Sequence, residues 1–111
     1  MPTFGTPGRR VAIVAGLRTP FARSGTTLKS LSAIDLGKRC VAELLQRSEI
    51  DPVLVEAIIY GTVVQSVLAP NIAREISLMP QLPRGVQAFT VGRACAPANH
   101  ALTAAAAQIT P

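Results

Sequence analysis

The chain has 111 residues, of which 49% are apolar and 15% are charged, and its formal net charge is +5 at pH 7. This length suits one compact domain and excludes two, and the composition argues against wholesale disorder. The longest apolar run covers residues 11–15, which is too short for a transmembrane helix or for the apolar stretch of a signal peptide. We therefore expect no transmembrane segment and a cytoplasmic location.

The basic charge and the two cysteines narrow the classes of partner. Basic residues are spread mostly singly from Arg9 to Arg93, and the four aromatic residues are not interleaved with a basic cluster. Nucleic acid is therefore not an expected partner, and a small phosphate-bearing ligand fits the scattered charge equally well. Cys40 and Cys95 form neither a CxxC pair nor a cluster with histidine, so no metal site is expected. Without an export signal both thiols should be reduced, which leaves one of them free to do chemistry.

The first half of the chain predicts one strand and one helix. Residues 10–16 are apolar and rich in β-branched side chains, which is typical of a strand buried on both faces. The segment Ser32-Ala-Ile-Asp35 then has the pattern of a capping box. Behind it, apolar residues recur at helical spacing to about Ser48, which predicts an amphipathic helix.

The second half of the chain predicts two more strands and two more helices. Strands are expected over residues 57–64 and about 87–91, and helices over residues 72–78 and 96–109. The alternation of strands and helices predicts an α/β fold, with a mostly parallel sheet of three strands and flanking helices. Because the chain ends one helix after its third predicted strand, we expect this fold to be incomplete.

Cys95 falls between the last predicted strand and the last predicted helix. A thiol at this position would face the positive end of the helix dipole and unpaired N–H groups, as a nucleophile at a strand-to-helix turn does. Pro97 suits the first helical turn, because its missing N–H would have no intrahelical partner there. The alternative is that Cys95 is a small buried hydrophobic residue, as most free cysteines are. Cys40 lies on the apolar stripe of its helix, and we expect it to belong to the core.

Five blocks of the sequence resemble landmarks of the thiolase family, in the same order and at plausible spacing. Together they cover about residues 9–109, so residues 1–111 would form a partial N-terminal thiolase domain. The branch that the chain resembles is the 3-ketoacyl-CoA thiolase of bacterial fatty-acid-oxidation complexes and of the β-subunit of the mitochondrial trifunctional protein. The blocks are residues 10–23, Ala33-Ile-Asp-Leu-Gly37, Tyr60-Gly-Thr-Val-Val-Gln65, Ala69-Pro-Asn-Ile-Ala-Arg-Glu75 and Val91-Gly-Arg-Ala-Cys-Ala96.

The resemblance implies an acyltransferase, acetyl-CoA C-acyltransferase, with Cys95 as the nucleophile that takes the acyl group as a thioester. The implied reaction is the thiolytic cleavage of 3-ketoacyl-CoA by CoA to acetyl-CoA and a shortened acyl-CoA. Coenzyme A is then a substrate, and no cofactor or metal is implied. The resemblance also implies a homodimer for the full-length protein and association with a hydratase/dehydrogenase subunit of a fatty-acid-oxidation complex.

The sequence departs from the family pattern in two ways. The Gly-His-Pro and Cys-x-Gly blocks, which supply a histidine and a second cysteine in thiolases, do not occur in it. Near Cys95, Gly92 replaces a commonly polar residue, and Pro97-Ala98 replaces a small, often hydroxylated or glycine pair. We therefore expect this chain alone to be inactive. Two alternatives stay open, namely a truncated, non-catalytic thiolase remnant or interaction module, and a Claisen-condensing enzyme of the same superfamily.

Other polar residues receive structural predictions. His100 follows Cys95 by five residues, about 140° around a helix, so the two side chains should diverge. Asn71 and Arg74 are expected to cap and pack the short helix that they begin. Arg18 and Arg23 could meet CoA phosphates, although solvated or structural roles fit them as well.

Overall fold

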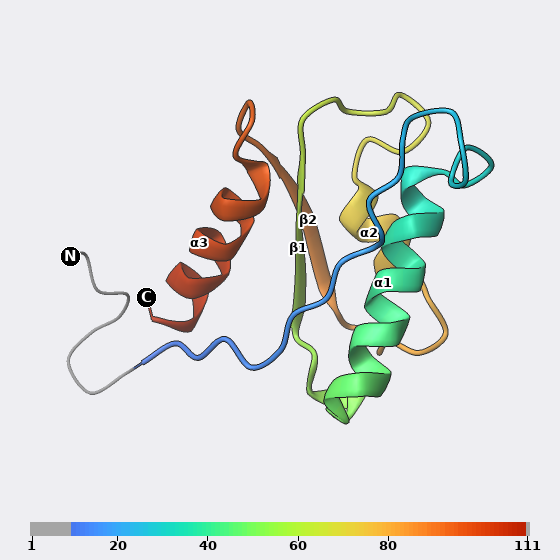
Figure 1. The fold of residues 1–111 in the computed structure, drawn as a ribbon. Helices are drawn as coiled ribbons and strands as arrows, with labels where there is room; N and C mark the ends of the chain where they lie inside the picture. Colours follow the sequence, from blue (N-terminus) through green and yellow to red (C-terminus); the bar gives the residue numbers. More distant parts are fainter. Residues whose placement is uncertain (1–9, 111) are drawn as a thin grey trace.

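The computed structural model describes residues 10–110. Residues 1–9 and 111 lie outside the described residues. The first of the scattered basic residues, Arg9, and most of the N-terminal segment considered for a signal peptide are therefore not described. Figure 1 shows two strands side by side, with two helices on one side of them and the last helix on the other. In chain order the elements are α1 (Ala33–Ser48), a 3-10 turn η1 (Pro52–Leu54), β1 (Ala57–Thr62), α2 (Ile72–Ser77), β2 (Gln87–Gly92) and α3 (Pro97–Ile109).

The sheet is parallel, as the alternation of strands and helices predicts. β1 pairs with β2 from Ala57 opposite Gln87 to Thr62 opposite Gly92. The connection between the two strands carries α2, which packs on both of them. The predicted α/β class, a parallel sheet with flanking helices, is therefore confirmed.

The predicted first strand, residues 10–16, is wrong. These residues form no regular element, and the sheet of the described residues has two strands rather than three. Ile13 and Val14 are 76% and 75% exposed, so the apolar side chains are not buried either. A strand needs a neighbour that takes its backbone hydrogen bonds, and neither β1 nor β2 pairs with this segment.

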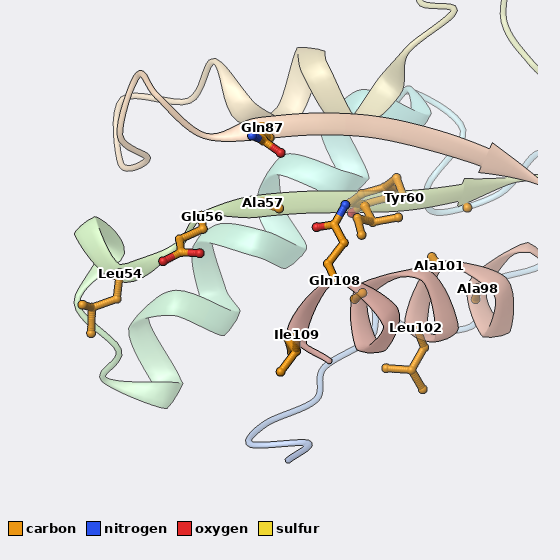
Figure 2. Close-up of a pocket in the computed structure, with 13 residues that line it drawn as sticks. Leu54, Glu56, Ala57, Tyr60, Gln87, Ala98, Ala101, Leu102, Gln108 and Ile109 are labelled. Carbon is orange, nitrogen blue, oxygen red and sulfur yellow. The ribbon is translucent and has the colours of Figure 1, made fainter. Parts of the chain in front are cut away.

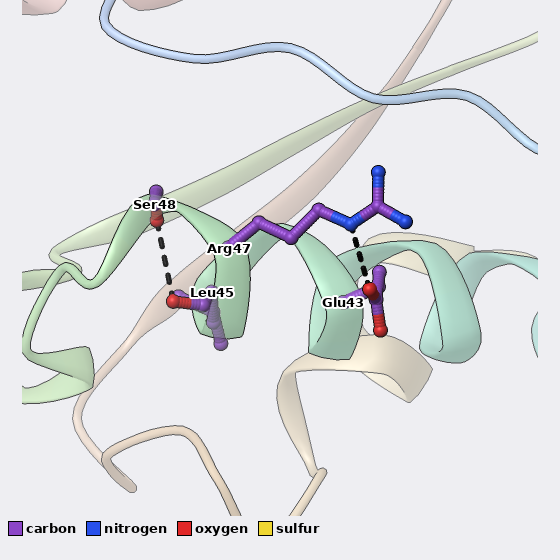
Figure 3. Close-up of polar contacts among 4 residues, drawn as sticks. All are labelled: Glu43, Leu45, Arg47 and Ser48. Carbon is purple, nitrogen blue, oxygen red and sulfur yellow. Dashed lines mark hydrogen bonds and ion pairs between the residues drawn. The ribbon is translucent and has the colours of Figure 1, made fainter.

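The helix α1 begins at the predicted capping box. The Ser32 hydroxyl accepts a hydrogen bond from the Asp35 N–H at 3.1 Å, and the Asp35 carboxylate accepts one from the Ser32 N–H at 2.9 Å. Near the other end, the Arg47 guanidinium donates to the Glu43 carboxylate at 2.7 Å, and the Ser48 hydroxyl donates to the carbonyl of Leu45 (Figure 3). Such an exposed ion pair one helical turn apart contributes only about 0.3–0.5 kcal/mol. The cap and the apolar face therefore decide where α1 lies.

The core lies between the sheet and the helices α1 and α2. Ile76 of α2 is fully buried, and Met79 and Leu82 in the following loop are nearly so. Gly37 lets α1 approach this core, because a methyl group in its place would meet the side chain of Ile76 and the hydroxyl of Tyr60. The partly buried apolar residues around the three are Val41, Ala42, Leu45, Val55, Ile58, Tyr60 and Ile72.

Candidate active site

Cys95 lies in the turn between β2 and α3, where the sequence predicts it. The Ala96 N–H donates to the Arg93 carbonyl at 2.7 Å and closes the turn, and the His100 N–H donates to the Ala96 carbonyl at 3.1 Å as α3 begins. The Cys95 side chain is exposed and the thiol is free. The alternative that Cys95 is a buried hydrophobic residue is therefore wrong.

The residue before the cysteine holds an unusual backbone conformation. Ala94 has a φ of 39°, in the left-handed region that residues with a Cβ rarely adopt. This conformation costs an alanine roughly 1–2 kcal/mol. Strained residues of this kind gather at functional sites, where the surrounding structure holds them in place. Ala94 lies in the short turn between β2 and α3, directly before the exposed Cys95.

The start of α3 supplies backbone donors but no side-chain cap. The N-cap residue Ala96 makes no side-chain hydrogen bond, and Pro97 at the first helical position has no N–H. By helix geometry, the N–H groups of Ala98 and Asn99 also lack intrahelical acceptors. These donors and the positive end of the helix dipole would favour negative charge near the turn. Gly92, the other departure from the thiolase pattern, leaves room for a side chain, because the nearest atom to an added methyl would be 3.6 Å away.

His100 does not join Cys95. Its Nδ1 lies 3.2 Å from Nη1 of Arg93, and because guanidinium can only donate, the ring nitrogen accepts this bond. Among the described residues no hydrogen bond joins the side chains at 95 and 100, and the expectation that the two diverge stays a prediction. Sequence reasoning missed the pairing of Arg93 with His100. The only signal for this contact in the sequence was a basic residue before the turn and a histidine one turn into the following helix.

The second cysteine belongs to the other side of the sheet. Cys40 lies on α1, is half-buried, and its Sγ is 3.7 Å from the Leu17 carbonyl oxygen. Burial raises the pKa of the nearby Tyr60, and the thiol of Cys40 adds to this increase. Figure 1 shows α1 and α3 on opposite sides of the strands, so the structure does not bring the two cysteines together. The prediction that Cys40 belongs to the core is not confirmed, because the side chain is only half-buried and is not among the residues that pack against Ile76, Met79 and Leu82.

Asn71 has the capping role that the sequence predicts. Its Oδ1 accepts from the Arg74 N–H at 3.2 Å and from the Thr90 hydroxyl at 2.7 Å, and its Nδ2 donates to the Ala88 carbonyl at 3.2 Å. The side chain therefore caps α2 and also fastens it to β2. Arg74 contributes its backbone N–H to the cap and is itself exposed.

The two arginines considered for CoA phosphates lie in the loop before α1. The Arg18 guanidinium donates to the Thr19 carbonyl and stacks on the Phe21 ring at 4.3 Å from its centroid. These contacts with neighbouring residues fit a structural role for Arg18. Arg23 is exposed, and its carbonyl accepts from the Thr26 N–H in a turn. Neither observation supports a phosphate site at these residues.

An open groove of about 950 Å³ lies between β1 and α3. Figure 2 shows strand residues such as Ala57 along one wall and helix residues such as Ala101 and Leu102 along the other. Glu56, Gln87 and Gln108 bring polar groups to the lining, and Gly61 and Ala98 belong to it as well. Ala98 is close in sequence to the cysteine turn. Within residues 10–110, no group of three or more acidic, histidine or cysteine side chains could hold a metal ion, and no helix is long and apolar enough to cross a membrane.

The fold and the turn define a class, namely an α/β unit that presents an exposed cysteine at a strand-to-helix turn. A comparison with known protein families shows which family of this class the chain belongs to. The model of the family described as "Thiolase, N-terminal domain" matches residues 11–111. The chain belongs to the thiolase family.

Individual relatives agree with the family. The chain is 57% identical over 89 residues to a 3-ketoacyl-CoA thiolase of Shewanella frigidimarina and 56% identical to one of Shewanella oneidensis. Each match covers 80% of this chain and 20% of the relative, so the chain spans about a fifth of the length of these curated relatives. Among solved structures, the Acat5 thiolase of Ascaris suum in complex with coenzyme A is similar, with a TM-score of 0.71 and 35% sequence identity. That match covers 77% of this chain and 22% of the Ascaris chain.

Proposed function

We propose that Cys95 is the acyl-accepting nucleophile in the thiolytic cleavage of 3-ketoacyl-CoA. The observation that supports this most is an exposed cysteine at a strand-to-helix turn in a chain 57% identical to a 3-ketoacyl-CoA thiolase. On this proposal residues 1–111 are the N-terminal part of an acetyl-CoA C-acyltransferase of the cytoplasm. The full protein would then act as a homodimer and associate with a hydratase/dehydrogenase subunit.

The proposed reaction has two halves. In the first, the Cys95 thiolate forms a bond to the 3-keto carbon, the bond between C2 and C3 of the substrate breaks, and C2 takes a proton as acetyl-CoA leaves. In the second, the CoA thiol loses its proton and attacks the acyl-cysteine, which releases the shortened acyl-CoA and restores the Cys95 thiol. A cysteine suits both halves, because its thiolate is a strong nucleophile and a good leaving group. The N–H groups of Ala98 and Asn99 are candidate donors to the oxyanion that forms at the attacked carbon.

Both halves need a proton carrier near the thiol. The only histidine of the chain, His100, is hydrogen-bonded to Arg93, and the second cysteine lies on α1 beyond the sheet. Groups that transfer protons commonly contribute about 10²–10⁴ each to the rate. We therefore propose that turnover requires further residues, of the kind found in the Gly-His-Pro and Cys-x-Gly blocks of thiolases, and that these 111 residues show no turnover alone.

The transfer of an acetyl group from acetyl-CoA tests the role of Cys95 without those further residues, because thiolate that is already present in equilibrium can attack a thioester without a proton carrier. This exchange forms a sulfur–carbon bond at Cys95 and breaks the one to CoA, and the proton of the cysteine thiol ends on CoA. Peptide mapping by mass spectrometry should find the acetyl group on Cys95 and not on Cys40. Cys95→Ser is the control that should remove it, and Cys40→Ser the control that should not. A folded chain that is alkylated at Cys95 but never acetylated there would favour the non-catalytic remnant.

The coding sequence beyond residue 111 separates the remaining alternatives. Gly-His-Pro and Cys-x-Gly blocks in frame would support a thiolase. A pair of histidines like that of ketosynthases would support a Claisen-condensing enzyme, and an immediate stop codon would support the remnant.

A further inference from the structure

Gly61 of β1 lies against the backbone of the first turn of α3. A methyl group built on Gly61 would overlap the carbonyl carbon and oxygen of Pro97 and lie 2.8 Å from the backbone nitrogen of Ala98. All three are backbone atoms, so no rotation of a side chain relieves the overlap. The helix can lie this close to the strand only because residue 61 has no Cβ.

This close approach distinguishes Gly61 from the other glycines described. An added methyl at Gly16 or Gly85 would meet nothing within 4 Å, and one at Gly92 would make an ordinary contact at 3.6 Å. Gly37 also has close neighbours, but the nearest is the flexible side-chain end of Ile76. Gly61 is therefore the glycine whose substitution would displace α3 itself.

The displacement would reach Cys95 because the turn that carries it is held at both ends. At one end, β2 is fixed to β1 by the register, in which Gly61 lies opposite Val91 and Thr62 opposite Gly92. At the other end, the first turn of α3 rests on Gly61. Between these ends only four residues, 93–96, span the gap, and Ala94 among them is already in the left-handed region. Because the turn is this short, a movement of the helix would also move the turn and Cys95 within it.

We propose that Gly61 is a positioning residue for Cys95, holding the start of α3 where its free N–H groups and positive dipole end act on the thiol. This inference rests on the proposed function, in which Cys95 is the nucleophile. It adds to that site a residue of β1, which is far from Cys95 in the sequence. Gly61 itself touches no reacting atom in this scheme.

The test compares two alkylating reagents of similar size and different charge. Iodoacetate is an anion and iodoacetamide is neutral, so the ratio of their rate constants at Cys95 reports the local electrostatics, and a change in exposure cancels. In a Cys40→Ser background, Gly61→Ala should lower this ratio by about two- to fivefold, the loss expected when a helix terminus moves away from an anion. Gly85→Ala, the matched control in an open turn, should leave the ratio unchanged. An unchanged ratio in folded Gly61→Ala would overturn the proposal.

Two further measurements test the proposal if the Gly61→Ala chain does not melt cooperatively and is therefore not folded. Combining it with Pro97→Gly makes the first turn of α3 more pliable, and the folded double variant should show a lower ratio than Pro97→Gly alone. In the unsubstituted chain, nuclear Overhauser contacts from the Gly61 α-protons to the Ala98 amide should be present. Equal ratios for the double and single variants, or absence of those contacts, would overturn the positioning role.

The same samples separate this inference from the proposed function. A lowered ratio without acetylation of the unsubstituted chain by acetyl-CoA would refute the acyl-transfer function and retain the positioning role. Acetylation of the unsubstituted chain with no effect of Gly61→Ala on the ratio would refute the positioning role alone.

Discussion

At the scale of single residues, backbone conformation matters more than side-chain chemistry around the candidate site. Among residues 10–110 no charged side chain is hydrogen-bonded to the Cys95 thiol, and the features of its turn are the positive φ of Ala94 and the uncapped start of α3. The position of Cys95 could be predicted from sequence, because a strand, a turn and a proline-started helix are local patterns. The contacts from Arg93 to His100 and from Gly61 to Pro97 could not, because each depends on how α3 lies against the sheet.

Ala94→Gly should stabilise the chain by about 0.5 kcal/mol. Glycine removes the roughly 1–2 kcal/mol cost of the left-handed conformation, and the greater entropy of the unfolded chain offsets about 0.4–1 kcal/mol of that gain. Urea denaturation of the two chains measures the difference. Ala107→Gly, at an exposed position of α3, is the matched control and should instead destabilise by about 0.5–1 kcal/mol. A loss of stability in Ala94→Gly equal to that of the control would show that residue 94 is not strained.

The cap of α1 should make stability depend on acid pH. The backbone N–H of Ser32, and then its hydroxyl, hold the pKa of Asp35 below its ordinary value of 3.8. Because the pKa is lower in the folded chain, the contribution of Asp35 is fully present above pH 3.8 and is lost as the pH falls through the folded value. The drop in melting temperature below pH 4 should therefore be smaller in Asp35→Asn than in the unsubstituted chain. Ser32→Ala, which removes the hydroxyl but keeps the carboxylate, should reduce the drop only in part, and identical pH profiles would contradict the assignment.

At the scale of elements, the helices could be predicted closely and the sheet only in part. The helix of residues 33–48 begins and ends where the capping box and the apolar spacing predict, and the strands at β1 and β2 differ from prediction by one or two residues at their ends. Helix caps and apolar periodicity depend on residues that are close together in the sequence, so both can be predicted from the sequence directly. The strand expected at residues 10–16 failed because a strand exists only with a partner. Its partner is not a property of the segment itself.

The attachment of α2 to the sheet depends on one side chain. Asn71→Ala removes the helix cap, the acceptor for Thr90 and the donor to Ala88, so we expect a loss of about 2–3 kcal/mol in the free energy of unfolding. Asn71→Asp is the matched variant, because it keeps the two acceptor bonds and removes the donor, and it should lose less. Chemical denaturation followed by circular dichroism measures both. Equal losses for the two variants would show that the cap contributes little.

At the scale of the whole molecule, the two faces of the sheet differ. The face under α1 and α2 holds the buried core around Ile76, whereas the face under α3 is open along the groove beside β1. Exposed apolar side chains remain on α3, where Leu102 is 53% exposed. The net charge of +5 and the apolar composition did not reveal this asymmetry, because they carry no information on which face a residue occupies. The asymmetry places the two cysteines in different surroundings.

Alkylation at neutral pH should therefore distinguish the cysteines by their place in the fold. Cys95 is exposed in its turn, whereas Cys40 is half-buried on α1 with its thiol directed to the Leu17 carbonyl. Cys40 must wait for a local opening of α1 against residues near Leu17, so brief treatment with iodoacetamide should label Cys95 roughly tenfold faster.

Peptide mapping after a short reaction assigns the label, with Cys95→Ser and Cys40→Ser as controls for each site. The comparison applies to a sample that gives a cooperative melt, because an unfolded chain exposes both thiols and should label them at similar rates. Faster labelling of Cys40 in a folded sample would mean that the turn after β2 does not present its thiol to solvent. The geometric argument for Cys95 as a nucleophile would then fail at its first step.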